Sequence, residues 1–261
     1  MPFPMLQFCV TAIIPARNEE GNIAAVVQAL LQQTNSAGQR LISEVIVADN
    51  GSTDRTAKLA QAAGATVVFV PIAGYGRACW EASKVAQGNV LLFVDGDGAA
   101  DPANAAEILS KVFEGADLVI GERSHPDPHS MSGAQRFGNA LACALIRLLW
   151  RAPVNDLGPY RAIRRAAFDS IDMRDRSFGW TVEMQVRAHV LRMTVAQVPV
   201  AWHARLSGNS KISGTFGGIV GAGLGILGMV CRLWLQERRR PRLQLLTSNV
   251  PGTSDIFVNK I

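Results

Sequence analysis

Short apolar, β-rich runs alternate with helical patterns from Val10 to about Gly121. The candidate strands are residues 10–14, 44–48, 66–70, 90–94 and 117–120. After the first of them, Ile23, Val26, Val27, Leu30 and Leu31 recur at i, i+3, i+4, i+7 and i+8, the stripe of a helix packed on a sheet. Further helices are expected near residues 54–63, 74–87 and 102–114. The alternation predicts an α/β fold with a mostly parallel, Rossmann-like sheet flanked by helices.

The pattern changes after Gly121. Residues 124–132 have the Pro, Ser and Asp content of a surface loop, and helices near 134–150 and 181–191 and a strand over 194–202 follow. Residues 214–231 form an uncharged, Gly-rich apolar run. We therefore expect a catalytic-type domain over 1–212, an apolar and membrane-associated helix with a basic end over 213–240, and a flexible tail over 241–261.

Composition narrows the class of protein. The chain has 261 residues, 48% of them hydrophobic, which is enough for one large domain with a substantial core. Its net charge of +5 is modest, and the arginines that follow the apolar run favour an anionic membrane or phosphates over nucleic acid. The four cysteines form no Cys-x-x-Cys pair, and the first residues lack a signal-peptide pattern. We expect a cytoplasmic protein at the inner face of the cell membrane, bound peripherally or by shallow insertion.

Three polar loops directly follow predicted strands. They are 15–20 (Pro-Ala-Arg-Asn-Glu-Glu), 49–54 (Asp-Asn-Gly-Ser-Thr-Asp) and 95–98 (Asp-Gly-Asp-Gly). Ligands of open parallel sheets bind at the carboxyl ends of the strands, so these loops are expected to converge on one rim.

Asp95-Gly96-Asp97 is the strongest local signal for chemistry. Two carboxylates at i and i+2 after a buried strand can face one cation, and hard oxygen ligands suit Mg²⁺ or Mn²⁺, which neutralise diphosphate charge. A solvated surface turn is the alternative for an isolated Asp-x-Asp.

Further motifs follow in a fixed order: Gly74-Tyr75-Gly76-Arg77-Ala78, Gly121-Glu122-Arg123, Asp156-Leu157-Gly158-Pro159-Tyr160-Arg161, Trp180-Thr181-Val182-Glu183, and Arg205-Leu206-Ser207-Gly208-Asn209-Ser210-Lys211. Together with the three polar loops, they resemble the family 2 glycosyltransferases of GT-A fold, especially the polyprenyl (dolichyl) phosphate glycosyltransferase branch. The resemblance covers about residues 10–211.

The resemblance implies roles for individual residues. Nucleotide-sugar binding would involve Pro15, Arg17, Glu19, Asp49, Asp95, Arg205 and Lys211. The metal, Mg²⁺ or Mn²⁺, would be held by Asp95 and Asp97, and the catalytic group would comprise Asp97, Arg123, Asp156 and Glu183. Ala99 stands where relatives often place a third ligand, and Asp101 is either its substitute or a helix cap. The glycines of 74–78 either contact phosphate or only permit a tight helix start.

The resemblance implies a metal-dependent, inverting glycosyltransferase that moves a sugar from a nucleotide-sugar to a polyprenyl-phosphate lipid. UDP-glucose is the favoured donor and GDP-mannose the next, by family likeness alone. A lipid phosphate is already anionic and needs no general base, whereas a sugar hydroxyl would need one, with Asp156 or Glu183 as the candidates.

Alternatives stay open. The acceptor could be a hydroxyl, or the protein could be a non-catalytic nucleotide-sugar or lipid-binding protein. A nucleotidyltransferase is disfavoured because the loop 15–20 lacks a Gly-rich form. The expected partners are the donor, a lipid-phosphate acceptor and a membrane surface, with no nucleic acid, and homo-oligomers are left open. The run 214–231 would lie at the membrane interface, span the bilayer, or be buried against protein.

Overall fold

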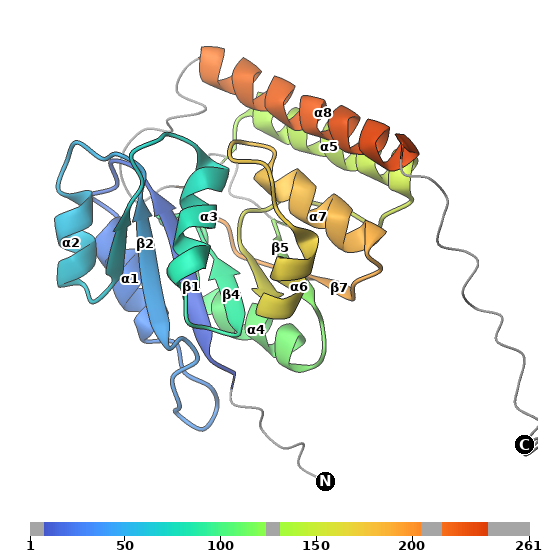
Figure 1. Cartoon of the computed structure of the whole chain (residues 1–261). Coiled ribbons are helices and arrows are strands. Elements are labelled where there is room, and N and C mark those ends of the chain that lie inside the picture. Colours follow the sequence, from blue (N-terminus) through green and yellow to red (C-terminus); the bar gives the residue numbers. More distant parts are fainter. Residues whose placement is uncertain (1–7, 124–130, 205–215, 240–261) are drawn as a thin grey trace, which may run out of the picture.

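The computed structural model describes residues 8–123, 131–204 and 216–239 (Figure 1). The strands are β1 (Val10–Ala16), β2 (Glu44–Asp49), β3 (Thr66–Phe69), β4 (Val90–Phe93), β5 (Leu118–Glu122), β6 (Arg161–Arg164) and β7 (Val195–Pro199). The helices are α1 (Ile23–Leu31), α2 (Thr56–Ala62), α3 (Tyr75–Val85), the 3₁₀ turn η1 (Pro102–Asn104), α4 (Ala105–Phe113), α5 (Gly133–Trp150), α6 (Arg165–Ile171), α7 (Trp180–Val190) and α8 (Phe216–Arg239).

The seven strands form one sheet in the order β3-β2-β1-β4-β6-β5-β7. Every pairing is parallel except those of β6, which runs antiparallel between β4 and β5. The predicted fold class, a mostly parallel sheet flanked by helices, is confirmed. β6 and α6 are absent from the sequence-based prediction, because Arg-Ala-Ile-Arg carries only two apolar positions and α6 has only seven residues.

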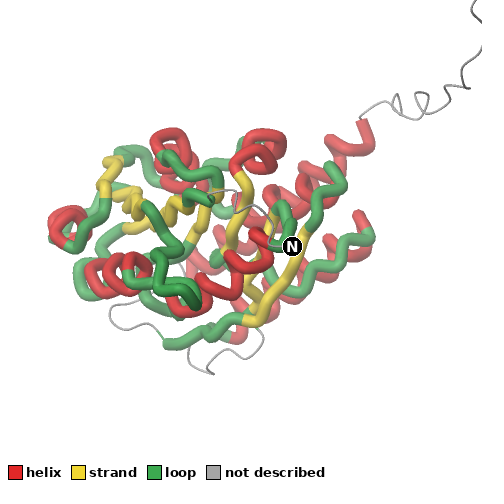
Figure 2. Tube along the Cα trace, turned by 90° about the horizontal axis from the view of Figure 1, so that it is seen from below, coloured by secondary structure: helices red, strands yellow, loops and turns green. Residues whose placement is uncertain are grey.

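Both faces of the sheet are covered, as Figure 2 shows from below. α1, α2 and α4 pack on one face and α3, α6 and α7 on the other. Alternate residues of a strand point to opposite faces, so Ala12 and Ile14 join the first core while Ile13 joins the second. Burial on both sides explains why the strands read as continuous apolar runs.

α5 and α8 form a further layer outside α7 and lie side by side (Figure 1). Met229, Val230 and Leu233 of α8 are buried in one cluster with residues of α5 and α7. The second half of α8 is therefore part of the packed protein, which matches the buried alternative for this part of the apolar run. Within the described residues, no helix combines the length and apolar character that crossing a bilayer requires. The predicted boundary at 212 and the tail 241–261 lie outside the described residues.

Candidate active site

The loops that follow β1 and β2 are tied together at the carboxyl edge of the sheet. The backbone N–H of Asn18 donates to Ser52 Oγ (2.9 Å), and that of Glu19 donates to Thr56 Oγ1 (2.7 Å). Asp49, only 4% exposed, accepts the backbone N–H of Ser52 at 3.0 Å. Asn18 adopts a left-handed φ of 52°, which Asn tolerates better than most residues. These hydrogen bonds hold the two loops together as one unit.

The nucleoside-pocket candidates occupy this unit. Pro15 is half-buried at the end of β1, and its register partner on β2 is the residue before Asp49. Arg17 is exposed. Glu19 accepts a hydrogen bond from the Asn22 side chain at 2.8 Å. The structure thus brings Pro15, Arg17, Glu19 and Asp49 to one rim, and their contact with a nucleoside stays a prediction.

Asp95 and Asp97 follow β4 on the same edge. The Tyr75 hydroxyl donates to Asp95 Oδ1 at 3.2 Å, and Asp97, 7% exposed, accepts the backbone N–H of Ala99 at 3.0 Å. Burial and the charge of Asp95 raise the pKa of Tyr75 well above its usual value, so this hydroxyl stays a donor. A Cβ at Gly96 would lie 3.1 Å from a side-chain methyl of β1, so the loop lies close to that strand.

The residues present suit a divalent cation that is also held by substrate. Among the described residues, no group of three His, Cys, Asp or Glu side chains could hold a metal. Asp101 does not add a third carboxylate: it accepts the N–H of Ala103 at 2.9 Å as a helix cap and lies 3.8 Å from His203. Two carboxylates with diphosphate oxygens are a common way to bind Mg²⁺ in nucleotide sites, so Asp95 and Asp97 fit such an ion.

Arg123 and Asp156 form a buried, bidentate ion pair. Arg123 donates from Nε to Oδ2 at 2.8 Å and from Nη2 to Oδ1 at 2.6 Å, and the two side chains are 12% and 6% exposed. Burial alone would raise the pKa of Asp156, but the hydrogen bonds and charge of Arg123 hold it below 3.8. The Trp202 ring lies 5.3 Å from the Arg123 guanidinium carbon. Asp156 is thereby kept anionic and is a weak proton acceptor.

Glu183 is also fully engaged. It is 1% exposed, and its Oε2 accepts the backbone N–H groups of Arg174 (2.9 Å) and Asp175 (2.7 Å). Its Oε1 pairs with Arg187 at 2.9 Å. Glu183 therefore holds the segment before α7 in place.

That segment packs on the start of α3. A Cβ at Gly74 would lie 2.2 Å from the Arg176 carbonyl oxygen, and one at Gly76 would lie 2.8 Å from that of Asp175. The N–H groups of Gly76 and Arg77 donate to backbone carbonyls of the same segment. This packing fits the tight helix start, one of the two alternatives for the Gly-x-Gly motif, and a contact with phosphate stays a prediction.

Three residues of the site had no role in the sequence-based prediction. Asn50 bonds to the carbonyls of Val70 (3.0 Å) and Ile72 (2.8 Å) and accepts the N–H of Gly74 (2.8 Å), which fixes the loop between β3 and α3. Its position beside Asp49 in a polar loop was the only signal.

Arg161 and Asn139 are the other two. Arg161 is fully buried and donates to the carbonyls of Gly158 and Thr181, and burial lowers its pKa to about 10. Asn139 on α5 accepts from Leu157 N–H (3.1 Å) and Arg123 Nη2 (3.4 Å). Both support the loop of Asp156, a role visible only in three dimensions. Arg205 and Lys211 lie outside the described residues.

The fold, a mostly parallel sheet with polar loops at the carboxyl ends of its strands, is that of the GT-A glycosyltransferases. The sequence profile described as glycosyl transferase family 2 matches residues 11–171. The chain belongs to this family.

Known relatives agree. An uncharacterized glycosyltransferase of Mycobacterium tuberculosis is 33% identical over 81% of this chain and 93% of its own length. A dolichyl-phosphate hexose transferase of Haloferax volcanii is 27% identical over 88% of this chain and 96% of its own length. Among solved structures, glucosyl-3-phosphoglycerate synthase of M. tuberculosis, in complex with Mn²⁺, UDP and phosphoglyceric acid, has a TM-score of 0.70 at 22% identity, over 87% of this chain and 79% of that one.

Proposed function

We propose that the protein is a metal-dependent, inverting glycosyltransferase that moves a hexose from a nucleotide-sugar to a polyprenyl-phosphate lipid at the inner face of the cell membrane. UDP-glucose is the favoured donor and GDP-mannose the next. The relative named as a dolichyl-phosphate hexose transferase supports the acceptor class, and the Mn²⁺ and UDP bound to a structural neighbour support the metal and the donor.

The main support for a phosphate acceptor is that both candidate bases, Asp156 and Glu183, are already occupied by ion pairs and hydrogen bonds. Asp156 is paired with Arg123 and has a lowered pKa, and Glu183 holds two N–H groups and Arg187. Neither suits the removal of a proton from a hydroxyl. A phosphate acceptor needs no such base, because its oxygen is already anionic near neutral pH.

The chain would act mainly by positioning and by electrostatics. The loops after β1 and β2 would hold the nucleoside through Pro15, Arg17, Glu19 and Asp49. Asp95 and Asp97, after β4, would hold a divalent ion, which would neutralise charge on the leaving diphosphate. Arg205 and Lys211 would add charge-assisted hydrogen bonds to phosphates.

The reaction would be a single displacement at the anomeric carbon. A phosphate oxygen of the lipid forms the new bond while the bond to the nucleoside diphosphate breaks, so the configuration inverts. The Arg123–Asp156 pair would shape the acceptor side by holding the loop of Asp156 in place. Tyr75 would keep Asp95 aimed at the same edge through their hydrogen bond.

The test is release of nucleoside diphosphate from UDP- and GDP-sugars, with polyprenyl phosphate, phosphoglyceric acid or no acceptor, in Mg²⁺, Mn²⁺ or EDTA. Asp97→Asn keeps an oxygen for the Ala99 N–H but removes the charge, so we expect activity to fall more than about hundredfold. Asp172→Asn, which removes an exposed carboxylate elsewhere, is the matched control.

Each outcome is informative. Release that needs both metal and lipid phosphate, and is lost in Asp97→Asn only, supports the proposal and names the donor. Release with phosphoglyceric acid instead moves the acceptor to a hydroxyl. Donor binding without release in any arm would identify a non-catalytic binding protein and refute the proposal.

A further inference from the structure

The outer face of α5 carries an exposed apolar stripe. Phe137, Leu141 and Leu148 are 70%, 36% and 75% exposed, and exposed Ala144 lies between them. The spacing i, i+4, i+7, i+11 places all four on one side of the helix, over about 16 Å. The opposite side is buried against α7 and α8 through Ala142, Cys143 and Ile146. α5 is thus apolar on both sides, and the described part of the chain covers only one of them.

The charges that α5 itself carries beside this stripe all have one sign. Residues 131–155 contain three arginines, Arg136, Arg147 and Arg151, and no Asp or Glu. All three are exposed, and no carboxylate of the described residues pairs with them. A helix designed only for water would carry both signs on its outer face. Apolar side chains flanked by arginines suit the boundary between anionic headgroups and acyl chains.

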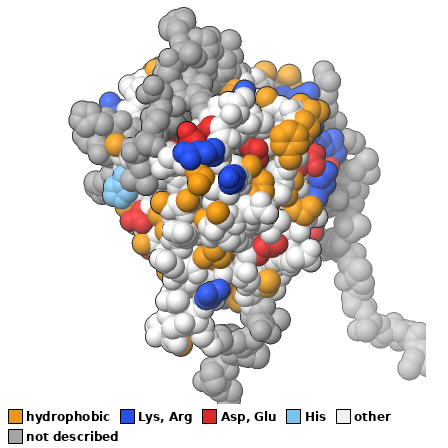
Figure 3. Space-filling view, turned by 90° about the vertical axis from the view of Figure 1, so that its left-hand side faces the viewer, with side chains coloured by type: hydrophobic (Ala, Val, Ile, Leu, Met, Phe, Trp, Pro, Cys, Tyr) orange, Lys and Arg blue, Asp and Glu red, His pale blue; other side chains and the backbone are white. Residues whose placement is uncertain are grey.

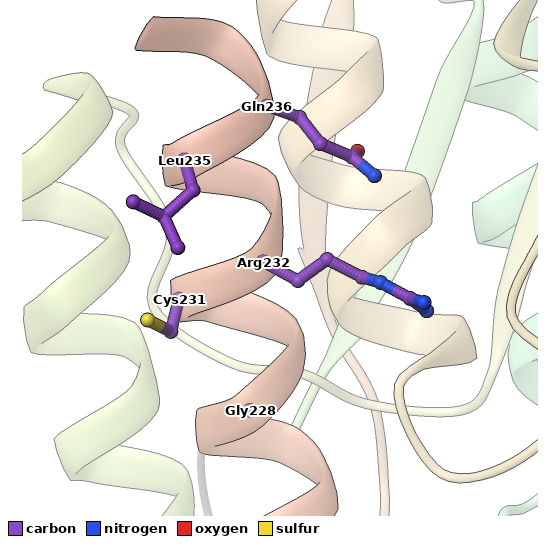
Figure 4. A pocket seen from close by; sticks show the side chains of 5 residues that line it. All are labelled: Gly228, Cys231, Arg232, Leu235 and Gln236. Carbon is purple, nitrogen blue, oxygen red and sulfur yellow. The ribbon is translucent and has the colours of Figure 1, made fainter. Parts of the chain in front are cut away.

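The neighbouring helix extends the same layer. In Figure 4, Cys231 and Leu235 of α8 point toward α5, whereas Arg232 and Gln236 point the other way. These four and Gly228 line an open hollow of about 460 Å³, and Leu235 is 42% exposed. By contrast, the face shown in Figure 3, at the α2 and β3 end of the molecule, mixes positive and negative side chains.

α5 also carries a residue of the candidate active site. Asn139, two residues after Phe137 and therefore on the opposite side of the helix, accepts hydrogen bonds from Arg123 and from the backbone of Leu157. A bilayer that met the stripe would therefore lie about 10–12 Å, the width of α5, from the loop of Asp156.

We propose that the α5 stripe, meaning Phe137, Leu141 and Leu148 with Arg136, Arg147 and Arg151, docks the protein on an anionic lipid bilayer with α5 parallel to the surface. The inference rests on the proposed function in one respect: an enzyme whose acceptor is a lipid must bind at the membrane surface. Docking requires no membrane-spanning helix.

The experiment is co-sedimentation of the full chain with vesicles of phosphatidylcholine alone or with about 30% phosphatidylglycerol. We expect binding to the anionic vesicles that weakens with salt. Arg136→Gln/Arg151→Gln should lower the partition constant roughly 25-fold, at about fivefold for each charge near the surface. Phe137→Ser/Leu148→Ser should lower it at least about tenfold on both vesicle types, because the apolar contact is lost.

Matched variants lie far from α5. Phe69→Ser/Ile72→Ser removes side chains that are 66% and 59% exposed near the edge strand β3, and Arg40→Gln/Lys58→Gln removes two exposed charges. Both should bind vesicles as the wild type does. Thermal melting checks that each variant folds. If the serine variants do not fold, the arginine variants alone test the docking.

Two results would overturn the docking: absence of vesicle binding by the wild type, or equal loss in the stripe and control variants. A dimer in sedimentation velocity that the stripe variants abolish, without vesicle binding, would assign the stripe to a second copy instead. Titration of UDP with Mn²⁺ into the same proteins separates the two proposals. Vesicle binding without metal-dependent UDP binding would leave docking standing and refute the proposed function.

Discussion

Replacing Glu183 by Gln tests whether this buried carboxylate positions backbone or takes part in chemistry. The carboxylate accepts two backbone N–H groups, of Arg174 and Asp175, and pairs with Arg187 at 2.9 Å. Gln offers one acceptor oxygen for these two sets of donors, and its amide would face one of them donor to donor. We therefore expect Glu183→Gln to loosen the segment that packs on the start of α3.

The magnitude follows from the burial of the pair. Removing one partner of a buried ion pair costs about 3–5 kcal/mol. Arg187 is 14% exposed and also donates to the carbonyl of Ile171, so the lower end, about 3 kcal/mol, is expected. For a chain of this size, each kcal/mol of destabilisation lowers the Tm by about 2–4 °C, so we expect the Tm of the variant to be lower by about 6–12 °C. Because the active edge keeps its own residues, kcat/KM well below Tm should fall less than about tenfold.

The assay pairs thermal unfolding with a pH–rate profile at a temperature where both proteins are folded. Glu81→Gln is the matched control, because Glu81 pairs with Lys84 on the surface of α3 and such pairs contribute less than about 1 kcal/mol. Loss of a general base would instead lower kcat about 10²–10⁴-fold and remove a limb of the pH profile. That result with an unchanged Tm would refute the positioning role.

Three further changes probe the neighbouring contacts. Asp156→Asn breaks the buried pair with Arg123, and we expect about 3 kcal/mol of destabilisation near neutral pH in urea unfolding. Because the folded-state pKa of Asp156 is lowered, the difference in unfolding free energy between variant and wild type is largest above pH 3.8 and shrinks as the pH falls through the folded-state pKa. A difference that stayed constant down to about pH 2 would contradict the ion pair. Gly76→Ala sets a Cβ 2.8 Å from the Asp175 carbonyl oxygen, and a cost of about 1–3 kcal/mol should appear in the same melts; an unchanged Tm would show that the backbone yields. Tyr75→Phe removes the hydroxyl that donates to Asp95, one of the two candidate metal ligands, so half-saturation of UDP binding should need about tenfold more Mn²⁺; equal titrations would disprove this.

Much of the fold follows from residue patterns alone. The apolar runs at 10–14, 44–48 and 90–94 are buried on both faces, so their signal is strong, and the structure places β1, β2 and β4 there. β6 could not be predicted, because a strand held between two others by backbone pairing needs little apolar signal of its own. The long helix α5 was predicted from its sequence. Which of its two apolar sides is buried and which is exposed could not be predicted, because this depends on the helices that pack on it.

The sequence by itself determined the family, the acidic edge and the order of the loops that form it, because each depends on local patterns that survive outside any particular packing. Only the tertiary structure decided how the side chains at that edge are used. Asp156 and Arg123, 33 positions apart, neutralise each other in a buried pair, and Glu183 holds backbone rather than facing the edge freely. Charge, burial and partner together set the chemistry of a carboxylate, and the last two arise only when distant segments meet.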